Sequence, residues 1–222
     1  MKFSHRFDLG VVLAAEKKEN FSATVPMFVP SNESGKLYKM DNHIMVSVSG
    51  IVADANYLID MGRLHCMRHT YAQRSPIYVE EVVKHLANHK HSYTQYGSSR
   101  PFGVSLMYAG YDRQCGFQLY SSDPSGNYAA WRAHATGKNC VNSISTLKED
   151  YTEGMTLDEG VIMAAKILGK SMEVNKPDAS RFEIGVMTLD PASKKATSRR
   201  VEGAELDKIL ADAKVFENLE TK

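Results

Sequence analysis

Two pairs of histidines have a spacing that could bind a metal ion. His65 and His69, and then His85 and His89, stand four residues apart, so on a helix each pair would place two imidazoles on one face. The segment from His65 to His69 lacks the glutamate that serves as base in helical metalloprotease motifs, and the sequence marks no third ligand. We therefore expect solvated or hydrogen-bonded histidines, and we assign no metal and no cofactor.

Other motifs that carry chemistry are absent from the sequence. The glycines form neither a dinucleotide-binding G-x-G-x-x-G nor a phosphate-binding G-x-x-x-x-G-K loop, and no G-x-S-x-G turn presents a serine nucleophile. A basic cluster could contact an acidic partner, but scattered charges of this kind are more typical of a solvated hairpin between two strands. Its members are Lys194, Lys195, Arg199 and Arg200.

Composition favours a compact globular protein and excludes several partners. The 27 basic and 26 acidic residues among 222 give a net charge of +1, which lacks the excess that binding to nucleic-acid phosphates requires. The longest apolar run, Val11 to Ala15, is far shorter than the roughly 20 residues of a membrane span, and the start has no apolar signal segment. Cys66, Cys115 and Cys140 are odd in number and widely spaced, which predicts neither a disulfide framework nor a zinc site. We expect one domain over residues 1–222, without nucleic acid or membrane as partner.

Hydrophobic periodicity predicts the elements that must position any site. Strands are expected at residues 10–15 and 43–50, where short β-branched runs occur, and helices at 53–74 and from Pro76 onward, where apolar residues recur every three or four positions. Three strands at 103–110, 115–120 and 127–135, joined by turn-forming segments, predict an antiparallel meander.

The second half predicts a further pair of helices, a strand and a closing helix. Thr156 and Glu159 fit a capping box at the start of an amphipathic helix, preceded by helical spacing over 144–151. A strand at 182–189 and a helix over 204–219 complete the pattern. Runs of strands followed by runs of helices favour a layered α+β fold with a helical pair on each face of stacked sheets.

Six segments of the sequence form a long ordered set: Gly10 to Glu16, Lys36 to Lys39, Val48 to Ala55, Tyr93 to Ser105, Tyr108 to Asp112 and Gly116 to Tyr128. With this set, the sequence resembles the α-type subunits of the proteasome core particle over about nine tenths of the chain. The resemblance implies a four-layer αββα sandwich of the N-terminal-nucleophile hydrolase type. It also implies a non-catalytic subunit of a threonine-protease complex, acting in ubiquitin-dependent protein degradation in the cytoplasm and nucleus.

The same resemblance implies the partners. These are neighbouring α-type subunits in a seven-membered outer ring that controls substrate entry, a β-type ring beneath it, and the C-terminal tails of regulatory particles. Lys36 matches the family's lysine in the pocket between neighbours that receives these tails, and it is a candidate for that role here. Gly35 precedes it where the family usually has glutamate.

An active hydrolase of the same fold is the alternative. The catalytic members of the family use an N-terminal threonine, a carboxylate and a lysine. Glu16 and Lys36 match the carboxylate and lysine positions, but no threonine precedes Gly10. A non-catalytic subunit is therefore favoured over an active threonine-type enzyme. A truncated isoform that does not assemble remains a further alternative.

The start and one loop depart from the family pattern. Only Met1 to Phe7 precede Asp8, so residues 1–9 form an atypical, shortened start that is expected to lack the usual N-terminal helix and first strand. In that case Val11 to Leu13 would lose a strand partner, and we expect the sequence to be incomplete upstream. The alternative is that Met1 to Phe7 partly replace the first strand and that the assembled pore leaks at this position. Between Glu16 and Lys36 the interval is longer than in the family, and Val25 to Pro30 reads as an extended, proline-bounded insert.

Overall fold

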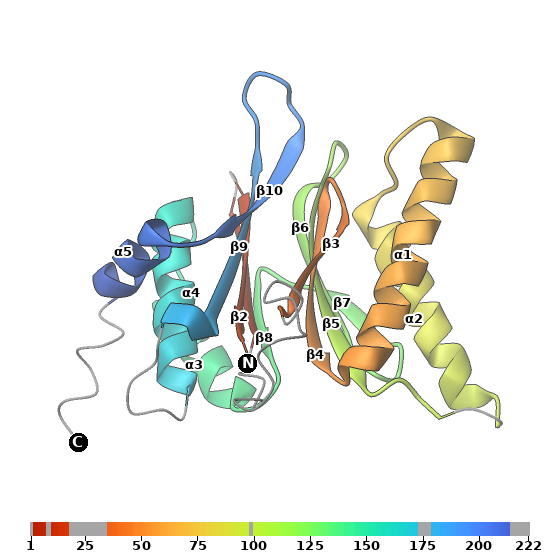
Figure 1. Ribbon diagram of the computed structural model, residues 1–222, viewed down its shortest axis with the longest axis horizontal. Helices are drawn as coiled ribbons and strands as arrows, with labels where there is room; N and C mark the ends of the chain where they lie inside the picture. Colours follow the sequence, from red (N-terminus) through yellow and green to blue (C-terminus); the bar gives the residue numbers. More distant parts are fainter. Residues whose placement is uncertain (1, 8–9, 18–34, 98–99, 173–178, 214–222) are drawn as a thin grey trace, which may run out of the picture.

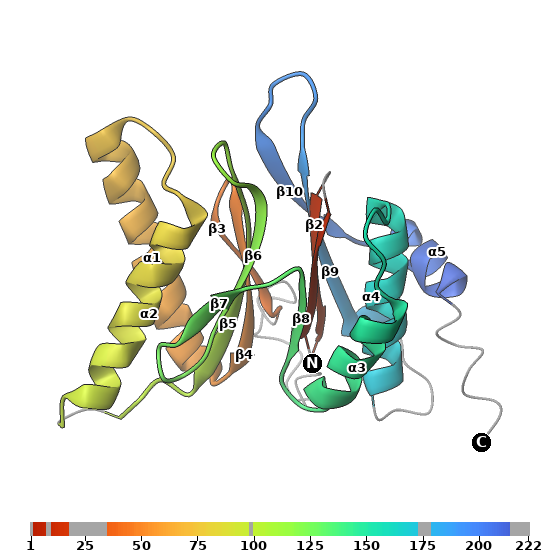
Figure 2. The same cartoon turned by 180° about the vertical axis from the view of Figure 1, so that it is seen from behind.

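The fold consists of two stacked sheets with helices on both outer faces (Figures 1 and 2). The computed structural model describes the backbone of residues 2–7 and all of residues 10–17, 35–97, 100–172 and 179–213. The predicted insert from Val25 to Pro30 lies outside these residues. None of the described helices is both long and apolar enough to cross a membrane.

Sheet A has the strand order β10-β9-β2-β1-β8, and each described pair is antiparallel. Its strands are β1 Lys2–Phe7, β2 Gly10–Glu16, β8 Ala133–Thr136, β9 Phe182–Leu189 and β10 Ala196–Val201. Helices α3 Cys140–Asp150, α4 Leu157–Ser171 and α5 Ala204–Asp212 cover its outer face (Figure 1). A short 3₁₀ turn, Ala179–Arg181, precedes β9.

Sheet B has the order β3-β4-β5-β6-β7 and is also antiparallel. Its strands are β3 Leu37–Asp41, β4 Ile44–Gly50, β5 Val104–Asp112, β6 Gly116–Ser122 and β7 Tyr128–Ala130. Helices α1 Val52–Gln73 and α2 Val79–Gln95 lie side by side on its outer face (Figure 2).

Alternation of side chains along the strands separates three apolar cores, as the period of two in a strand requires. In β2, Val12 and Ala14 pack toward α4 and α5, while Val11, Leu13 and Ala15 face sheet B. The third core lies between sheet B and the α1–α2 pair. The predicted four-layer αββα sandwich is therefore confirmed.

Two expectations about strands are wrong. Lys2–Phe7 form β1, which pairs with β2 from Lys2↔Ala15 to Phe7↔Gly10 and with β8 on its other side. Val11 to Leu13 therefore have a partner strand: the expected loss of the first strand is wrong, and residues 2–7 take that place, as in the alternative. The segment expected as one strand over 127–135 is two strands, because the chain leaves sheet B after β7 and enters sheet A as β8.

Most helix predictions are confirmed, and the differences concern the residues at which the helices begin or end. The expected closing helix over 204–219 is α5, described as far as Asp212; the rest of that range lies outside the described residues. Helix α1 ends at Gln73 and is followed by the C-cap residue Arg74, which is left-handed with φ of 55° and whose N–H donates to Thr70 O. Strand β3 was not predicted; it is a five-residue edge strand of sheet B, paired only with β4, which follows it in the chain.

Candidate functional site

The two residues matched to the family's catalytic pair lie beside the start of β9. Glu16 ends β2 opposite Phe182, and its Oε1 lies 3.2 Å from Arg181 Nη2. Lys36 immediately precedes β3, and its backbone N–H donates to Glu183 Oε2 at 2.6 Å. Pairing of β9 with β2 thus places Arg181, the last residue of the 3₁₀ turn, beside Glu16, whereas Glu183 of β9 reaches Lys36 across the two stacked sheets.

Glu183 is the residue that fixes the start of β3. Its side chain is 9% exposed, and Oε1 lies 3.5 Å from Arg200 Nη1. Arg200 Nη2 in turn donates to Leu37 O at 2.6 Å. Because a buried carboxylate needs donors to offset its desolvation, this Glu183–Arg200 clamp holds the backbone of Lys36 and Leu37 in place.

Gly35 allows the carboxylate of Glu183 to approach this closely. A Cβ built on Gly35 would lie 2.5 Å from Glu183 Oε1. A glutamate at residue 35, as in the family pattern, would require that carboxylate to move and would add a second negative charge beside it. The departure at Gly35 and the position of Glu183 are therefore linked.

The electrostatics of this cluster suit a structural site rather than a hydrolytic one. A general base must reach the proton it abstracts, whereas the described contact of the Glu16 carboxylate is an ion pair with Arg181. Within β3, burial and the charge of Glu183 raise the pKa of Tyr38, against the opposing effect of Arg200 and Arg63. The cluster can hold the lysine-bearing strand start in a fixed position.

Sequence reasoning alone did not identify Glu183 or Arg181. Both are separated from their partners by more than 140 residues, 147 for Lys36 to Glu183 and 165 for Glu16 to Arg181. Arg200 was singled out within the basic cluster but was expected to be solvated. Lys194 and Lys195 are exposed on the β9–β10 hairpin, whereas Arg199 pairs with Glu205 and Arg200 with Glu183.

The histidines of the helical pairs do not converge on a shared point. Among the described residues, no three His, Cys, Asp or Glu side chains are grouped as metal ligands. His69 Nδ1 lies 3.2 Å from Ser75 O, and since a carbonyl only accepts, Nδ1 carries the proton. His65 stacks instead on His85, with ring centroids 3.8 Å apart.

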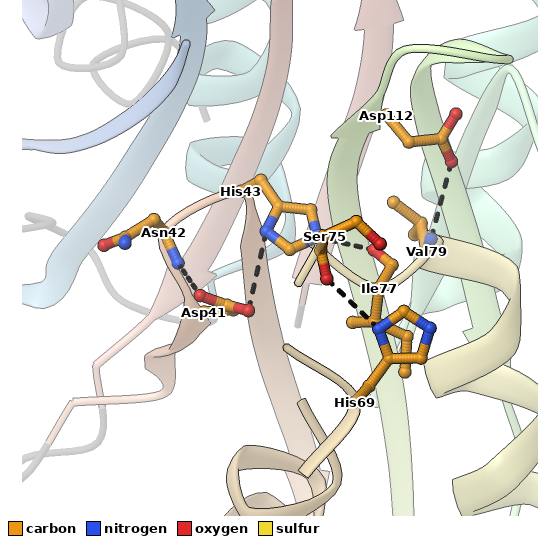
Figure 3. Close-up of polar contacts among 8 residues, drawn as sticks. All are labelled: Asp41, Asn42, His43, His69, Ser75, Ile77, Val79 and Asp112. Atoms are coloured by element: carbon orange, nitrogen blue, oxygen red, sulfur yellow. Dashed lines mark hydrogen bonds and ion pairs between the residues drawn. The ribbon is translucent and has the colours of Figure 1, made fainter. Parts of the chain in front are cut away.

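Two imidazoles and one carboxylate hold the connection between α1 and α2 (Figure 3). His43 Nε2 donates to Ile77 O at 2.7 Å, while its Nδ1 lies 3.6 Å from Asp41 Oδ2. At the first residue of α2, Val79 N–H donates to Asp112 Oδ2. These contacts fix the connection to the turn between β3 and β4 and to the end of β5.

Comparisons with known proteins agree with this geometry. A family model described as proteasome subunit matches residues 5–187. Proteasome subunit alpha type-4-1 from Oryza sativa subsp. indica is 42% identical over 204 residues, which are 92% of this chain and 80% of that protein. Proteasome subunit alpha type-4-A from Arabidopsis thaliana is 42% identical over 183 residues, 82% of this chain and 72% of that protein. With the family model covering most of the sandwich, this chain belongs to the proteasome subunit family.

Proposed function

We propose that this chain occupies one position in a seven-membered ring of α-type subunits that lies on a β-type ring and receives the C-terminal tails of regulatory particles. The chain is a structural, non-catalytic α-type subunit of the 20S core that assembles with other proteasome subunits. The observation that carries the proposal is the 42% identity to α type-4 subunits over 92% of the chain. The active threonine-type hydrolase is not favoured.

Purification of the tagged chain under native conditions, followed by native mass spectrometry, tests the proposed assembly. The expected result is recovery in a particle with core-particle mass that contains other α-type and β-type subunits. A matched preparation with only the tag must recover none of them. Recovery of the chain solely as a monomer would contradict the proposed role and would favour an isoform that does not assemble.

Docking of regulators is the finer part of the proposal, and it rests on Lys36. An ammonium group can form a charge-assisted hydrogen bond with a tail carboxylate. Lys36→Ala removes that group but keeps the backbone N–H that Glu183 accepts from, so the start of β3 should stay in place. We expect ring assembly to persist and tail affinity at this pocket to fall by about 1.5–3 kcal/mol, which is tenfold or more.

The measurement is binding of a fluorescent regulator-tail peptide, cross-linked to identify this pocket, on assembled particles. Lys39→Ala is the matched control, because Lys39 lies exposed three residues away on β3 and the variant loses the same charge. Equal affinity of the Lys36→Ala particle and the parent particle would rule out the proposed role of Lys36.

Residence in the cytoplasm and nucleus is part of the same proposal. Cell fractionation followed by detection of the chain in core particles tests it. Particles containing the chain are expected in both fractions, and their absence from one fraction would contradict that part.

A further inference from the structure

Four histidines form a row between α1 and α2, which we call the histidine seam: His65, His69, His85 and His89. At its centre the rings of His65 and His85 are stacked with an interplanar angle of 3° and centroids 3.8 Å apart. Toward one end of the seam, His69 Nε2 lies 3.7 Å from Glu81 Oε2. Toward the other, His89 packs among aromatic rings.

Two ring nitrogens of the seam are buried without compensation. Nε2 of His65 and Nε2 of His89 have no solvent contact and no hydrogen-bond partner among the described residues. Buried polar atoms are normally paired, so such atoms call for an explanation. Among the described residues, no three His, Cys, Asp or Glu side chains are grouped so as to hold a metal ion there.

The surroundings of His65 favour a neutral ring. Burial lowers the pKa of His65 most, and His85, His69 and Arg68 lower it further, while only Glu81 raises it. Two imidazolium ions at stacking distance would also repel each other. The stack is therefore compatible with two neutral rings and is disfavoured once charge accumulates on it.

The surroundings of His89 also disfavour the protonated ring. Its ring lies 5.6 Å from that of Phe102, 5.1 Å from that of Tyr93 and 6.0 Å from that of Tyr57. Burial and then His85 lower the pKa of His89. No carboxylate contributes to this shift, so a proton here would be placed in an aromatic pocket beside another histidine.

We propose that the histidine seam is a pH-sensitive contact that holds α1 against α2 when its rings are neutral and loosens when they are protonated. The opening begins at the His89 end and is limited at the His69 end. There, protonated His69 gains an ion pair with Glu81, and the connection stays bound through Ser75 O and Ile77 O. This property belongs to the helical layer and is independent of the proposed assembly.

The direction with pH follows from proton linkage. When a histidine has a lower pKa in the folded state, the unfolded or opened state binds more protons in acid, so stability is complete above the ordinary value of 6.5 and is lost as the pH falls. Each unit by which the folded pKa is lowered corresponds to about a tenfold change in the opening equilibrium.

Hydrogen–deuterium exchange of the full chain at pH 7.5 and pH 5.5, corrected for intrinsic exchange rates, tests the proposal. Amides of α1 and α2 are expected to lose protection in acid, by about tenfold per unit of lowered pKa. Amides of β9 and α4, which lie on the other side of the sandwich, serve as the internal reference. Equal protection of α1 and α2 at both pH values would overturn the proposal.

Two variants separate the seam from other acid effects. His85→Phe keeps an aromatic ring in the stack but removes its proton site, so the loss of protection in acid should shrink. His91→Phe is the matched control, since His91 lies on the same helix outside the seam, with Nδ1 3.1 Å from Ser125 O; its response should equal that of the parent. An unchanged acid response in His85→Phe would contradict the proposal.

If His85→Phe does not fold, titration of the histidine rings in the parent chain tests the proposal without a variant. Proton NMR of the histidine ring protons in the parent chain is expected to show His65 and His89 titrating below the ordinary histidine range, along with His134 of β8, which lies outside the seam. Titration of both His65 and His89 at or above that range would overturn the proposal.

Discussion

At the scale of single residues, Lys90 is the least expected side chain of the core. It is 0% exposed, and its Nζ donates to Val104 O at 3.1 Å and to Ser122 Oγ at 2.8 Å, with Ser122 O and Asp123 O as further acceptors. One ammonium group from α2 thus joins the start of β5 to the end of β6. Periodicity along α2 placed apolar neighbours inward but could not mark a buried lysine, because its acceptors are backbone atoms of distant strands.

Because of Lys90, we expect the free energy of unfolding to increase with pH in mildly alkaline solution. Burial lowers its pKa from 10.5 to about 7, opposed by Asp123. Between these values the unfolded chain binds the proton that the folded chain has released, so the free energy of unfolding increases as the pH rises from about 7 to 10.5. Urea denaturation across this range measures the slope.

The variant Lys90→Met identifies the source of that slope. It should flatten the pH dependence and, by leaving buried carbonyls without a donor, lower stability by about 1–3 kcal/mol at neutral pH. Lys84→Met, on an exposed position of the same helix, should leave the slope unchanged. A slope that persists in Lys90→Met would show that another group causes it.

At the scale of elements, the start of α4 depends on a reciprocal pair of side-chain hydrogen bonds. Thr156 Oγ1 accepts from Glu159 N–H at 3.3 Å, and Glu159 Oε2 accepts from Thr156 N–H at 2.8 Å. The second contact lowers the pKa of Glu159, so its stabilising effect is present above the ordinary range of a glutamate and is lost as the pH falls.

Removal of this cap should weaken the helix that covers sheet A. Thr156→Ala is expected to lower the free energy of unfolding by about 1 kcal/mol, measured by urea denaturation. Thr152→Ala, in the exposed segment before the helix, is the control and should change little. Equal stability of both variants would mean that the cap contributes nothing measurable.

The elements that were predicted correctly are those whose sequence signals lie within the element itself or directly beside it. The capping box marks α4, and the apolar run of Val11 to Ala15 marks β2, because both signals lie within a few residues. The destination of a strand is not a local property. Nothing within residues 127–135 shows that the chain changes sheets between β7 and β8, or that Lys2–Phe7 find partners in both β2 and β8.

The candidate site shows the same limit more strongly. Glu16 and Lys36 were identified through resemblance to a family, since neither has a local motif of its own. Their partners Arg181 and Glu183 come from the opposite end of the chain. Arg181 meets Glu16 because β9 pairs with β2, and Glu183 meets Lys36 where β9 of sheet A packs against the start of β3 in sheet B. No spacing rule predicts a contact that depends on the register of two strands so far apart in sequence.

At the scale of the whole molecule, the two sheets pack closely because one position in β9 has no side chain. A Cβ built on Gly185 would lie 2.9 Å from Met45 Sδ and 3.1 Å from Leu37 Cδ1. Met45 and Leu37 belong to sheet B and to the core between the sheets, which Met187 joins from the same face of β9. Glu183, two residues before Gly185, clamps the same strand β3.

Gly185→Val should therefore strain the sandwich and its site together. Overpacking of a well-filled core typically costs about 1–3 kcal/mol, and the strain should push β3 away from β9, which would weaken the contact of Lys36 N–H with Glu183. We expect Gly185→Val to have a lower free energy of unfolding in urea than the parent chain. Relative to the parent chain, hydrogen exchange should accelerate more in β3 than in β5. Gly97→Val is the control, because a Cβ there meets no atom within 4 Å. A Gly185→Val chain as stable as the control, with β3 still protected, would mean that the sheets can separate locally without loss and that Gly185 does not set their spacing.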